Sequence, residues 1–418
     1  MEPPRSAAFS LDTCVAARDG FWHYNGVKRS VVFLNSTFPC LSETFVFDQF
    51  EVLRESGLDL VLVANHRPAP DQVHPRMRAI QNEVHYLSEA TVGEFLIAHA
   101  LAGLRHPWRY LRGLVGACTG QERLGIALKQ FSGAALVAKR FGALPGARLH
   151  AHFTYGAAAV ARWTSVLTGL PYGLTLHGSD LSFDFPPDLE AKLAGADLLV
   201  SISRYNLEFL ASRFPAVRPA RLEVIGMGVP TLPPPAHRPR QGPLRILNVG
   251  RLSEHKAQHV LIGACALLVK WGLDFRCDIV GDGPAGPALA ALIERNGLGS
   301  RVRLLGPRFH DEVLALYGDA DLFVLCSVAE GMPIVLMEAM RAGVPVIASA
   351  ITAIPELVRD AGLLVPPEDV PALASAIRSV AQGEVDVAGM VARARAVVAS
   401  DYDLDTNHRR FARLLESL

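Results

Sequence analysis

The sequence predicts an α/β protein made of two doubly wound halves that face each other across a cleft. Short apolar runs alternate with helical stretches along most of the chain, which is the pattern of βαβ units. A proline-rich segment, residues 230–243, divides this alternation in two. The 418 residues, of which 50% are hydrophobic, are too many for one growing core, so we expect two large domains.

The first half predicts six buried parallel strands, because its apolar β-branched runs resemble strands covered on both faces. These runs occupy residues 30–34, 58–64, 147–153, 171–178, 197–203 and 221–227. A helix is expected from about Thr44 to Ser56. Residues 1–28 show no periodicity and predict a flexible N-terminal arm, which leaves residues 29–229 as the first domain.

The second half repeats the pattern after the proline-rich linker, residues 230–243. It predicts a second domain over residues 244–400 and a C-terminal helix over residues 401–418, which carries Phe411, Leu414 and Leu415 on one side. Six apolar runs predict its strands: residues 244–250, 275–281, 301–306, 321–326, 344–349 and 361–366. In two such sheets, ligands bind outside the carboxyl ends of the strands.

Bulk properties exclude several classes of protein. The formal net charge is zero, so nothing favours nucleic acid as a partner. The six cysteines are scattered without CxxC or Cys/His spacing, which argues against a disulfide scaffold or zinc site and favours a reducing compartment. No signal peptide and no run of eighteen apolar residues is recognised, so we expect a cytoplasmic protein without a membrane span.

The most informative pattern runs from Ser327 to Ala348 and contains two glutamates, Glu330 and Glu338. Glu330 follows an apolar run, and Glu338 comes eight residues later, just over two helical turns into a helix that starts near Pro333. The first turn of that helix offers free backbone N–H groups to a phosphate. The simpler alternative is an acidic first turn with Glu338 as a solvated surface residue.

A second pattern places two cations at the entrance of a helix. Gly250 and Arg251 follow an apolar run, and Lys256 comes five residues after the arginine. Cations there suit a diphosphate on which negative charge develops as a bond breaks. Ordinary surface charge is the alternative for both side chains.

These motifs resemble those of the family 4 glycosyltransferases, whose signature is two glutamates separated by seven residues. The resemblance implies the GT-B architecture of two Rossmann-like domains, a retaining reaction, and a nucleotide-diphosphate sugar as donor. It implies catalytic roles for Glu330, Arg251 and Lys256, with Glu330 at the transferred sugar. It further implies donor-binding roles for Glu338 at the ribose and for Gly250, Gly331, Met332, Pro333, Ile334, Val335, Gly306 and Arg308. Ala257 stands where the family has glycine.

Gly281, Gly283 and Gly286 form a GxGxxG pattern that also suits a nicotinamide-dependent oxidoreductase. The ribose-binding carboxylate expected about 20 positions later should fall near Gly306, where the sequence is Leu-Gly-Pro-Arg. We therefore interpret the glycines as a tight turn and residues 306–309 as a loop that contacts the donor base.

A loop in the first half indicates which group of glycosyltransferases the chain resembles. The sequence of this loop resembles the FPxxSETF stretch of bacterial exopolysaccharide and colanic-acid-type transferases. The resemblance implies that the loop lies beside the leaving phosphate and the acceptor. The acceptor or phosphate residues are then Asn35, Ser36, Phe38, Ser42 and Glu43. Helix capping is the structural alternative for Ser42 and Glu43. His177 begins an HGxD motif, and the resemblance implies that it lines the sugar pocket as a further catalytic residue.

Other positions depart from the family pattern. Pro230 replaces an acidic residue, and Thr352 and Ala353 occupy glycine positions of a GGxPE turn that ends at Glu356. The DxD-like carboxylates Asp401, Asp403 and Asp405 precede the terminal helix, where N-capping explains them better than a metal. Since basic residues already suit the diphosphate, we expect no metal and no other cofactor.

Residues 101–150 carry eight cations against one acid, with Trp108 and Tyr110 interleaved. On a helix, Arg105, Arg109 and Arg112 would share one face, which suits contact with an anionic membrane. A solvated basic face is the alternative.

The partners expected are a nucleotide-sugar donor and a glycan or polyprenol-linked acceptor. A nucleotide-sugar epimerase and a non-catalytic sugar-nucleotide binding protein remain alternatives.

Overall fold

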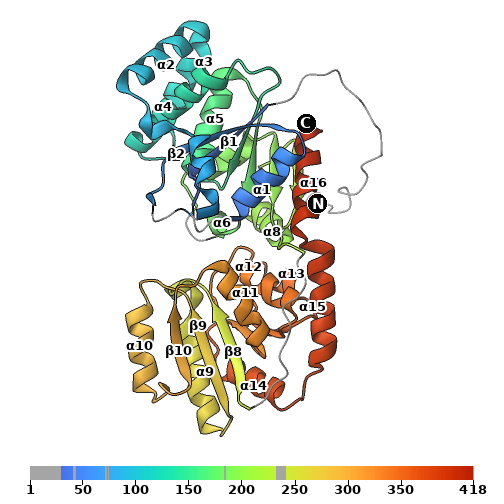
Figure 1. Cartoon of the computed structure of the whole chain (residues 1–418). Coiled ribbons are helices and arrows are strands. Elements are labelled where there is room, and N and C mark those ends of the chain that lie inside the picture. The colour runs from blue at the N-terminus through green and yellow to red at the C-terminus, as the bar shows by residue number, and fades with distance from the viewer. Residues whose placement is uncertain are drawn as a thin grey trace, which may run out of the picture.

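The computed structural model describes residues 30–40, 44–70, 73, 75–182, 185–231 and 242–417. Two α/β lobes lie one above the other in Figure 1, joined by the two C-terminal helices along one side. The predicted N-terminal arm, Ser42 and Glu43, and residues 232–241 of the predicted linker lie outside the described residues.

The first lobe contains a seven-stranded parallel sheet in the order β3-β2-β1-β4-β5-β6-β7. Six of these strands match the predicted runs, and the two-residue strand β3 was not predicted. The strands are β1 Ser30–Thr37, β2 Asp59–His66, β3 His85–Tyr86, β4 Arg148–His152, β5 Tyr172–Leu176, β6 Leu198–Ser201 and β7 Arg221–Val224.

The second lobe contains a six-stranded parallel sheet in the order β10-β9-β8-β11-β12-β13. Relative to its own first strand this is the doubly wound order of a Rossmann fold. The strands are β8 Leu244–Val249, β9 Phe275–Val280, β10 Val302–Gly306, β11 Leu322–Leu325, β12 Val346–Ser349 and β13 Leu363–Val365. The predicted α/β class with two Rossmann-like halves is confirmed.

Helices cover both sheets. Those of the first lobe are α1 Thr44–Glu55, α2 Val92–Arg105, α3 Pro107–Thr119, α4 Leu124–Phe141, α5 Gly156–Thr168, α6 Ser179–Ser182, α7 Leu189–Ala194 and α8 Arg204–Arg213. Those that follow are α9 Gln258–Lys270, α10 Gly286–Arg295, α11 His310–Asp319, α12 Ile334–Ala342, α13 Ile354–Val358, α14 Val370–Ala381, α15 Val387–Asp401 and α16 Leu404–Glu416.

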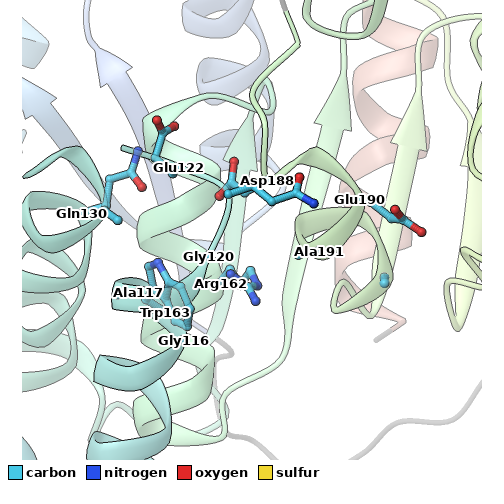
Figure 2. A pocket seen from close by; sticks show the side chains of 13 residues that line it. Gly116, Ala117, Gly120, Glu122, Gln130, Arg162, Trp163, Asp188, Glu190 and Ala191 are labelled. Atoms are coloured by element: carbon cyan, nitrogen blue, oxygen red, sulfur yellow. The ribbon is translucent and has the colours of Figure 1, made fainter. Parts of the chain in front are cut away.

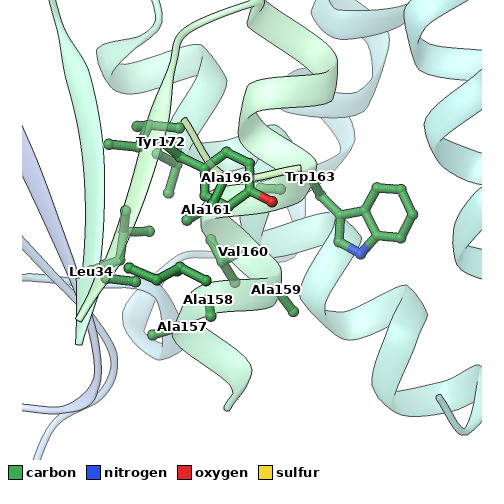
Figure 3. Packing of buried hydrophobic residues seen from close by; sticks show 14 of the residues in the cluster. Leu34, Ala157, Ala158, Ala159, Val160, Ala161, Trp163, Tyr172 and Ala196 are labelled. Carbon is green, nitrogen blue, oxygen red and sulfur yellow. The ribbon is translucent and has the colours of Figure 1, made fainter. Parts of the chain in front are cut away.

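Helix α5 shows why the first lobe packs tightly. Its alanine run, residues 157–159 with Ala161, is fully buried and lets the helix lie close to the sheet, while Trp163 turns outward toward neighbouring helices (Figure 3). Small side chains here allow a close helix-to-sheet approach that larger ones would prevent.

The predicted terminal helix is observed as α16, and a short break at residues 402–403 separates it from the preceding helix α15. Helix α15 packs against α12 of the second lobe, whereas α16 packs against α1 of the first. Phe411, Leu414 and Leu415 are buried in the core on the outer face of β1, so the expected apolar side of this helix is confirmed. The C-terminal segment therefore fastens the two lobes together.

The expectation that Arg105, Arg109 and Arg112 share one helix face is wrong. Arg105 ends α2, and the chain turns at His106 before Pro107 begins α3. Proline is favoured at the first position of a helix because the N–H donor that it lacks has no acceptor within the helix there, so Pro107 begins a separate helix. Arg109 also folds back toward the end of α5, where its guanidinium lies against Gly169.

Candidate active site

The two sheets bring their carboxyl ends together at the point where each strand order reverses. In the first sheet β1 and β4 are neighbours, and in the second β8 and β11. Ligands of doubly wound sheets bind at such switch points. The lobes are in contact there, because a Cβ atom placed on Gly178 would lie 3.0 Å from Gly331 Cα. Most sequence-predicted site residues follow these strands.

Glu330 forms the charged centre of the site on the second lobe. Its Oε1 atom lies 2.5 Å from Lys256 Nζ and accepts a hydrogen bond of 2.7 Å from Ser327 Oγ. The glutamate side chain is 8% exposed and the lysine 24%, so a buried carboxylate meets a partly accessible cation. The structure thus brings together two residues predicted separately.

The loop that carries Gly250 and Arg251 rests on the GxGxxG turn. Leu252 N donates to Asp282 O at 2.9 Å, and Ala285 N donates back to Leu252 O at 3.0 Å. A Cβ on Gly281 would lie 2.0 Å from Gly250 O, so this turn needs glycine to let the two backbones approach. The glycines therefore serve the chain's own backbone, and the predicted tight turn is confirmed. Arg251 is exposed at its end.

Helix α12 begins beside Glu330 and directs its N-terminus toward the same place. The first backbone N–H bonded within the helix is that of Leu336, which donates to Pro333 O. The preceding segment from Gly331 to Val335 supplies the N–H groups that a helix leaves without an internal acceptor, apart from Pro333, which has none. Such a terminus attracts an anion.

Glu338 is 5% exposed, which excludes the solvated alternative. Its Oε1 atom lies 2.7 Å from His310 Nε2, and its Oε2 atom accepts a 3.0 Å hydrogen bond from the Tyr317 hydroxyl. The hydrogen bond to Glu338 raises the pKa of His310, while burial raises the pKa of Tyr317 well above its usual range. Sequence reasoning missed both partners, although His310 directly follows the predicted base-contacting loop.

That loop connects β10 to α11. Gly306 adopts a φ of 72° at the end of β10 and accepts a hydrogen bond from Gly281 N, and Arg308 is exposed on the loop. Because His310 links the start of α11 to Glu338, the loop is held close to the proposed ribose-binding carboxylate. The Phe309 side chain is 69% exposed, which leaves an aromatic face free near this position.

On the first lobe, His177 lies in a cluster of aromatic and imidazole rings. Its Nε2 atom is 3.2 Å from His152 Nδ1, and its ring centroid is 4.2 Å from that of Phe153 and 5.1 Å from that of Phe45. Burial lowers the pKa of His177 well below its ordinary value and that of His152 to about 3. The lobe thus presents a neutral imidazole, which can hydrogen-bond without carrying charge.

The backbone of His177 is fixed by a buried polar chain. His177 N donates to Asp180 Oδ1 at 3.0 Å, and Thr154 N donates to Asp180 Oδ2 at 2.9 Å. The Thr154 carbonyl in turn accepts from Lys192 Nζ at 2.9 Å. Burial raises the pKa of Asp180 to about 6 and lowers that of Lys192. Lys192, fully buried, was not anticipated from the sequence.

The predicted N-terminal loop is only partly described. Asn35 is buried in β1, and neither of its side-chain amide atoms is hydrogen-bonded to the described part of the chain. Ser36, the next residue, is exposed. Phe38 requires a correction, because its side chain is 0% exposed and packs edge-on against Phe50 at 5.0 Å. Its side chain therefore supports the loop from the core.

Comparisons with known proteins agree with this geometry. Residues 243–383 match the family model described as "Glycosyl transferases group 1". The chain is 31% identical to the putative colanic acid biosynthesis glycosyltransferase WcaL of Escherichia coli K12, over 91% of this chain and 98% of that protein. The chain belongs to the group 1 glycosyltransferases. It is also 30% identical to the amylovoran biosynthesis glycosyltransferase AmsK of Erwinia amylovora, over 93% of this chain and 99% of that one.

Solved structures confirm the GT-B fold of this glycosyltransferase. Anabaena Alr3699/HepE, solved with UDP and glucose, is 21% identical with a TM-score of 0.68, covering 93% of this chain and 100% of that one. A sucrose-phosphate synthase from Thermosynechococcus elongatus is 19% identical with a TM-score of 0.71, covering 93% and 99%. At these identities the likeness concerns the fold.

One interlobe contact of the glycosyltransferase was missed. The Glu356 carboxylate accepts hydrogen bonds of 2.8–3.1 Å from the backbone N–H groups of Arg204 and Tyr205 at the start of α8. A carboxylate at a helix N-terminus is favourable. The Pro-Glu pair was noted only as part of a turn, in which Thr352 adopts a φ of 44° at a position where the family has glycine.

The DxD-like carboxylates have structural partners. Asp403 is the N-cap of α16 and accepts from Thr406 N at 2.9 Å, and Asp401 forms an ion pair with Arg359. The expected capping role is confirmed for Asp403. The described residues contain no group of three or more His, Cys, Asp or Glu side chains placed to hold a metal ion. None of the described helices is long and apolar enough to cross a membrane.

Proposed function

We propose that this glycosyltransferase is a retaining enzyme that moves a sugar from a nucleotide-diphosphate donor to a glycan or polyprenol-linked acceptor in bacterial exopolysaccharide assembly. The observation that carries the proposal is the cluster of Lys256, Ser327 and Glu330 beside the N-terminus of α12. The names of the relatives, which refer to colanic acid and amylovoran biosynthesis, support the polysaccharide role.

Different residues of the site bind different parts of the donor. Lys256, Arg251 and the first turn of α12 take the diphosphate, whose negative charge grows as the glycosidic bond breaks. Glu338 takes the ribose, the loop at residues 306–309 the base, and Glu330 the transferred sugar, with His177 opposite. Since none of the predicted residues is an obvious nucleophile for double displacement, attack occurs on the same face, assisted by the leaving phosphate.

The test of the reaction class has two parts. A panel of nucleotide sugars is screened for thermal stabilisation, because a donor adds RT ln(1 + [L]/Kd) to stability. The anomeric configuration of the product is then followed by proton NMR with the donor that binds. Retention supports the proposal, whereas inversion rejects the mechanism, and free epimerised sugar without transfer would identify an epimerase.

Independence from metal follows from the same charges. Arg251, Lys256 and a helix N-terminus supply the positive charge that a divalent ion supplies elsewhere. Transfer should therefore proceed at an unchanged rate in excess EDTA. Activity that is lost with EDTA and restored by manganese would contradict this part of the proposal.

A surface on α2, α3 and the start of α4 supports contact with anionic lipid. Nine of the thirteen exposed large hydrophobic side chains in the described chain lie between residues 92 and 126, among them Leu104 at 80% and Trp108 at 81% exposure. Exposed arginines, including Arg105 and Arg112, surround them. Apolar side chains with interleaved cations suit the boundary of an anionic bilayer, where a polyprenol-linked acceptor lies.

The membrane contact is tested by charge reversal. Replacing Arg105, Arg112 and Arg123 with Glu should reduce co-sedimentation with anionic vesicles by well over tenfold, because each cation contributes about 1 kcal/mol near such a surface. The matched control reverses three exposed cations of the second lobe, Lys270, Arg276 and Arg295, and should bind vesicles normally. Equal losses in both variants, or no binding by the wild type at low salt, would reject the contact.

A further inference from the structure

The first lobe contains a cavity of about 300 Å³ apart from the residues assigned to the donor. Helices α3, α4, α5 and α7 surround it, and Figure 2 shows lining side chains from these elements and from the loop between α3 and α4, with Glu190 directed away from the others. This volume lies at the lower end of the range of small-molecule sites. The cavity is therefore large enough for one sugar ring.

The cavity contains one buried polar atom without a hydrogen-bond partner and one cation without an ion pair in the described part of the chain. Gln130 Oε1 is buried without a hydrogen-bond partner in the described part of the chain. The half-buried Arg162 guanidinium packs over the Trp163 ring at 4.2 Å and forms no ion pair with any described residue. Buried polar groups are almost always satisfied by protein, water or a ligand, so the Gln130 oxygen indicates that water or a polar ligand occupies the cavity.

The remaining lining limits the chemistry of that occupant. Glu122, Asp188 and Glu190 contribute three carboxylates, and two cations lie beside them, Arg162 and the Lys192 that pairs with Asp188. Because the carboxylates outnumber the cations, the site disfavours phosphates and uronic acids. Trp163 and Ala191, with other small side chains, provide apolar surface between the polar groups. A neutral hexose fits both features, because its hydroxyls donate to carboxylates and accept from Arg162 while its C–H groups meet the apolar wall.

Contacts connect the cavity to the reaction site. A Cβ on Gly156, the first residue of α5, would lie 4.0 Å from Gln130 Nε2, so the glutamine lies near the sheet edge where β4 ends. From the other wall, Asp188 Oδ1 lies 2.6 Å from Lys192 Nζ. That lysine bonds to the Thr154 carbonyl, and Thr154 N shares Asp180 with His177 N.

We propose that this cavity is a saccharide subsite that binds a neutral sugar unit of the acceptor, an inference that rests on the proposed glycosyltransfer. Helices α3 and α4 line the cavity and also carry the exposed apolar and basic surface described above. A lipid-linked oligosaccharide would thus meet the lipid-facing surface and the sugar subsite on the same pair of helices. Lys192 is then the residue through which an occupied cavity steadies the His177 backbone.

The experiment uses full-length protein and saturation-transfer NMR with neutral disaccharides as probes, namely lactose, cellobiose and melibiose, with glucuronic acid for comparison. Wild type should give transfer signals from at least one neutral probe and none from glucuronic acid. Ala191→Trp, at an exposed position on the cavity rim, should abolish these signals, and Gln130→Leu should weaken binding at least tenfold. Ala211→Trp is the matched control, because it places the same side chain on an exposed alanine of α8.

Stabilisation by the nucleotide-sugar donor is measured on the same samples. Donor stabilisation of wild type without any saccharide signal, or signals that persist unchanged in Ala191→Trp, would overturn the subsite and leave the proposed function standing. Absence of donor stabilisation in wild type would instead reject the proposed function. Signals from glucuronic acid equal to those of the neutral probes would overturn the assignment of ligand class.

Discussion

The two lobes contribute opposite chemistry to the candidate site. The second lobe offers charge, with the Lys256–Glu330 ion pair, exposed Arg251 and the N-terminus of α12. The first offers His177 among neutral rings, with burial lowering the pKa of every imidazole around it. Under the proposed function, the second lobe therefore meets the charge that develops on the leaving nucleotide, while the first lobe supplies shape and hydrogen bonds to the sugar.

The two sites also differ in their access to solvent, because Lys256 is partly accessible whereas His177 is buried. Burial lowers the pKa of the histidines, since an apolar surrounding disfavours the charged imidazole. The polar chain from Lys192 to His177 compensates for the lack of charge by fixing the backbone. Variants of the two lobes should consequently fail in different ways.

Glu330→Gln should give the largest effect and should act on turnover. The substitution keeps the shape but removes the charge that holds Lys256, and losing one preorganised electrostatic contact costs about a hundredfold in rate. Steady-state kinetics with the identified donor measures kcat and KM. Glu294→Gln on the exposed face of α10 is the control, and a loss confined to KM in Glu330→Gln would contradict the assignment to the transferred sugar.

Glu338→Gln should weaken donor affinity about ten- to thirtyfold and change kcat little, because a ribose contact is made in the ground state and the transition state alike. Calorimetric titration with the donor measures the affinity. Tyr317→Phe removes a hydrogen bond to the same carboxylate without removing its charge, and should cost less. Unchanged donor affinity in Glu338→Gln would remove the carboxylate from the donor site.

The second lobe was largely predictable from sequence because its site is local. Glu330 and Glu338 lie on one loop and helix, and Arg251 and Lys256 on another, so spacing alone places them at strand ends. All six strands of the second sheet were predicted. The residues missed here, His310 and Tyr317, reach Glu338 from another helix, and only the folded chain brings them within 3.0 Å.

The first lobe was less predictable because its contacts span long distances in sequence. The two-residue strand β3 has too few residues to show a period, and the break between α2 and α3 defeats the helical spacing of Arg105 and Arg109. Lys192 is separated from Thr154 by 38 residues, and nothing in the sequence distinguishes it from an ordinary surface cation. Phe38 likewise belongs to a motif but is held in the core by rings that the motif does not contain.

Acidification should affect the first lobe through its histidines. His408 has an ordinary pKa of 6.5, and burial lowers it to about 4 in the folded chain. Between these values the unfolded chain binds a proton that the folded chain excludes, so the stabilisation is complete above pH 6.5 and falls as pH falls. The loss is up to about 1.4 kcal/mol per pH unit for each such histidine.

Urea unfolding at pH 7, 6, 5 and 4.5 measures this dependence in wild type and His408→Leu. The variant should show a shallower decline, smaller by up to one proton. Asp180 acts with the opposite sign, because burial raises its pKa to about 6, but it is present in both proteins and cancels in the comparison. Identical slopes would show that His408 does not titrate on unfolding.

Ala257→Gly should have the smallest effect. Ala257 begins α9 with a φ of 48°, which costs an L-residue roughly 1–2 kcal/mol, and glycine would relieve this strain. Glycine would also loosen the unfolded chain by about 0.5–1 kcal/mol and remove a buried methyl group worth about 0.8 kcal/mol. The terms nearly cancel, so the free energy of unfolding should change by less than about 1 kcal/mol, as measured by urea titration. Ala257→Val is the control, and it should destabilise by more, because a branched side chain is excluded from this backbone region. Donor affinity should stay the same in Ala257→Gly. The reason is that the side chain of Lys256 is positioned by its ion pair with Glu330, on the other side of the loop. A tenfold change in affinity would show that the backbone at this departure from the family pattern sets the position of Lys256.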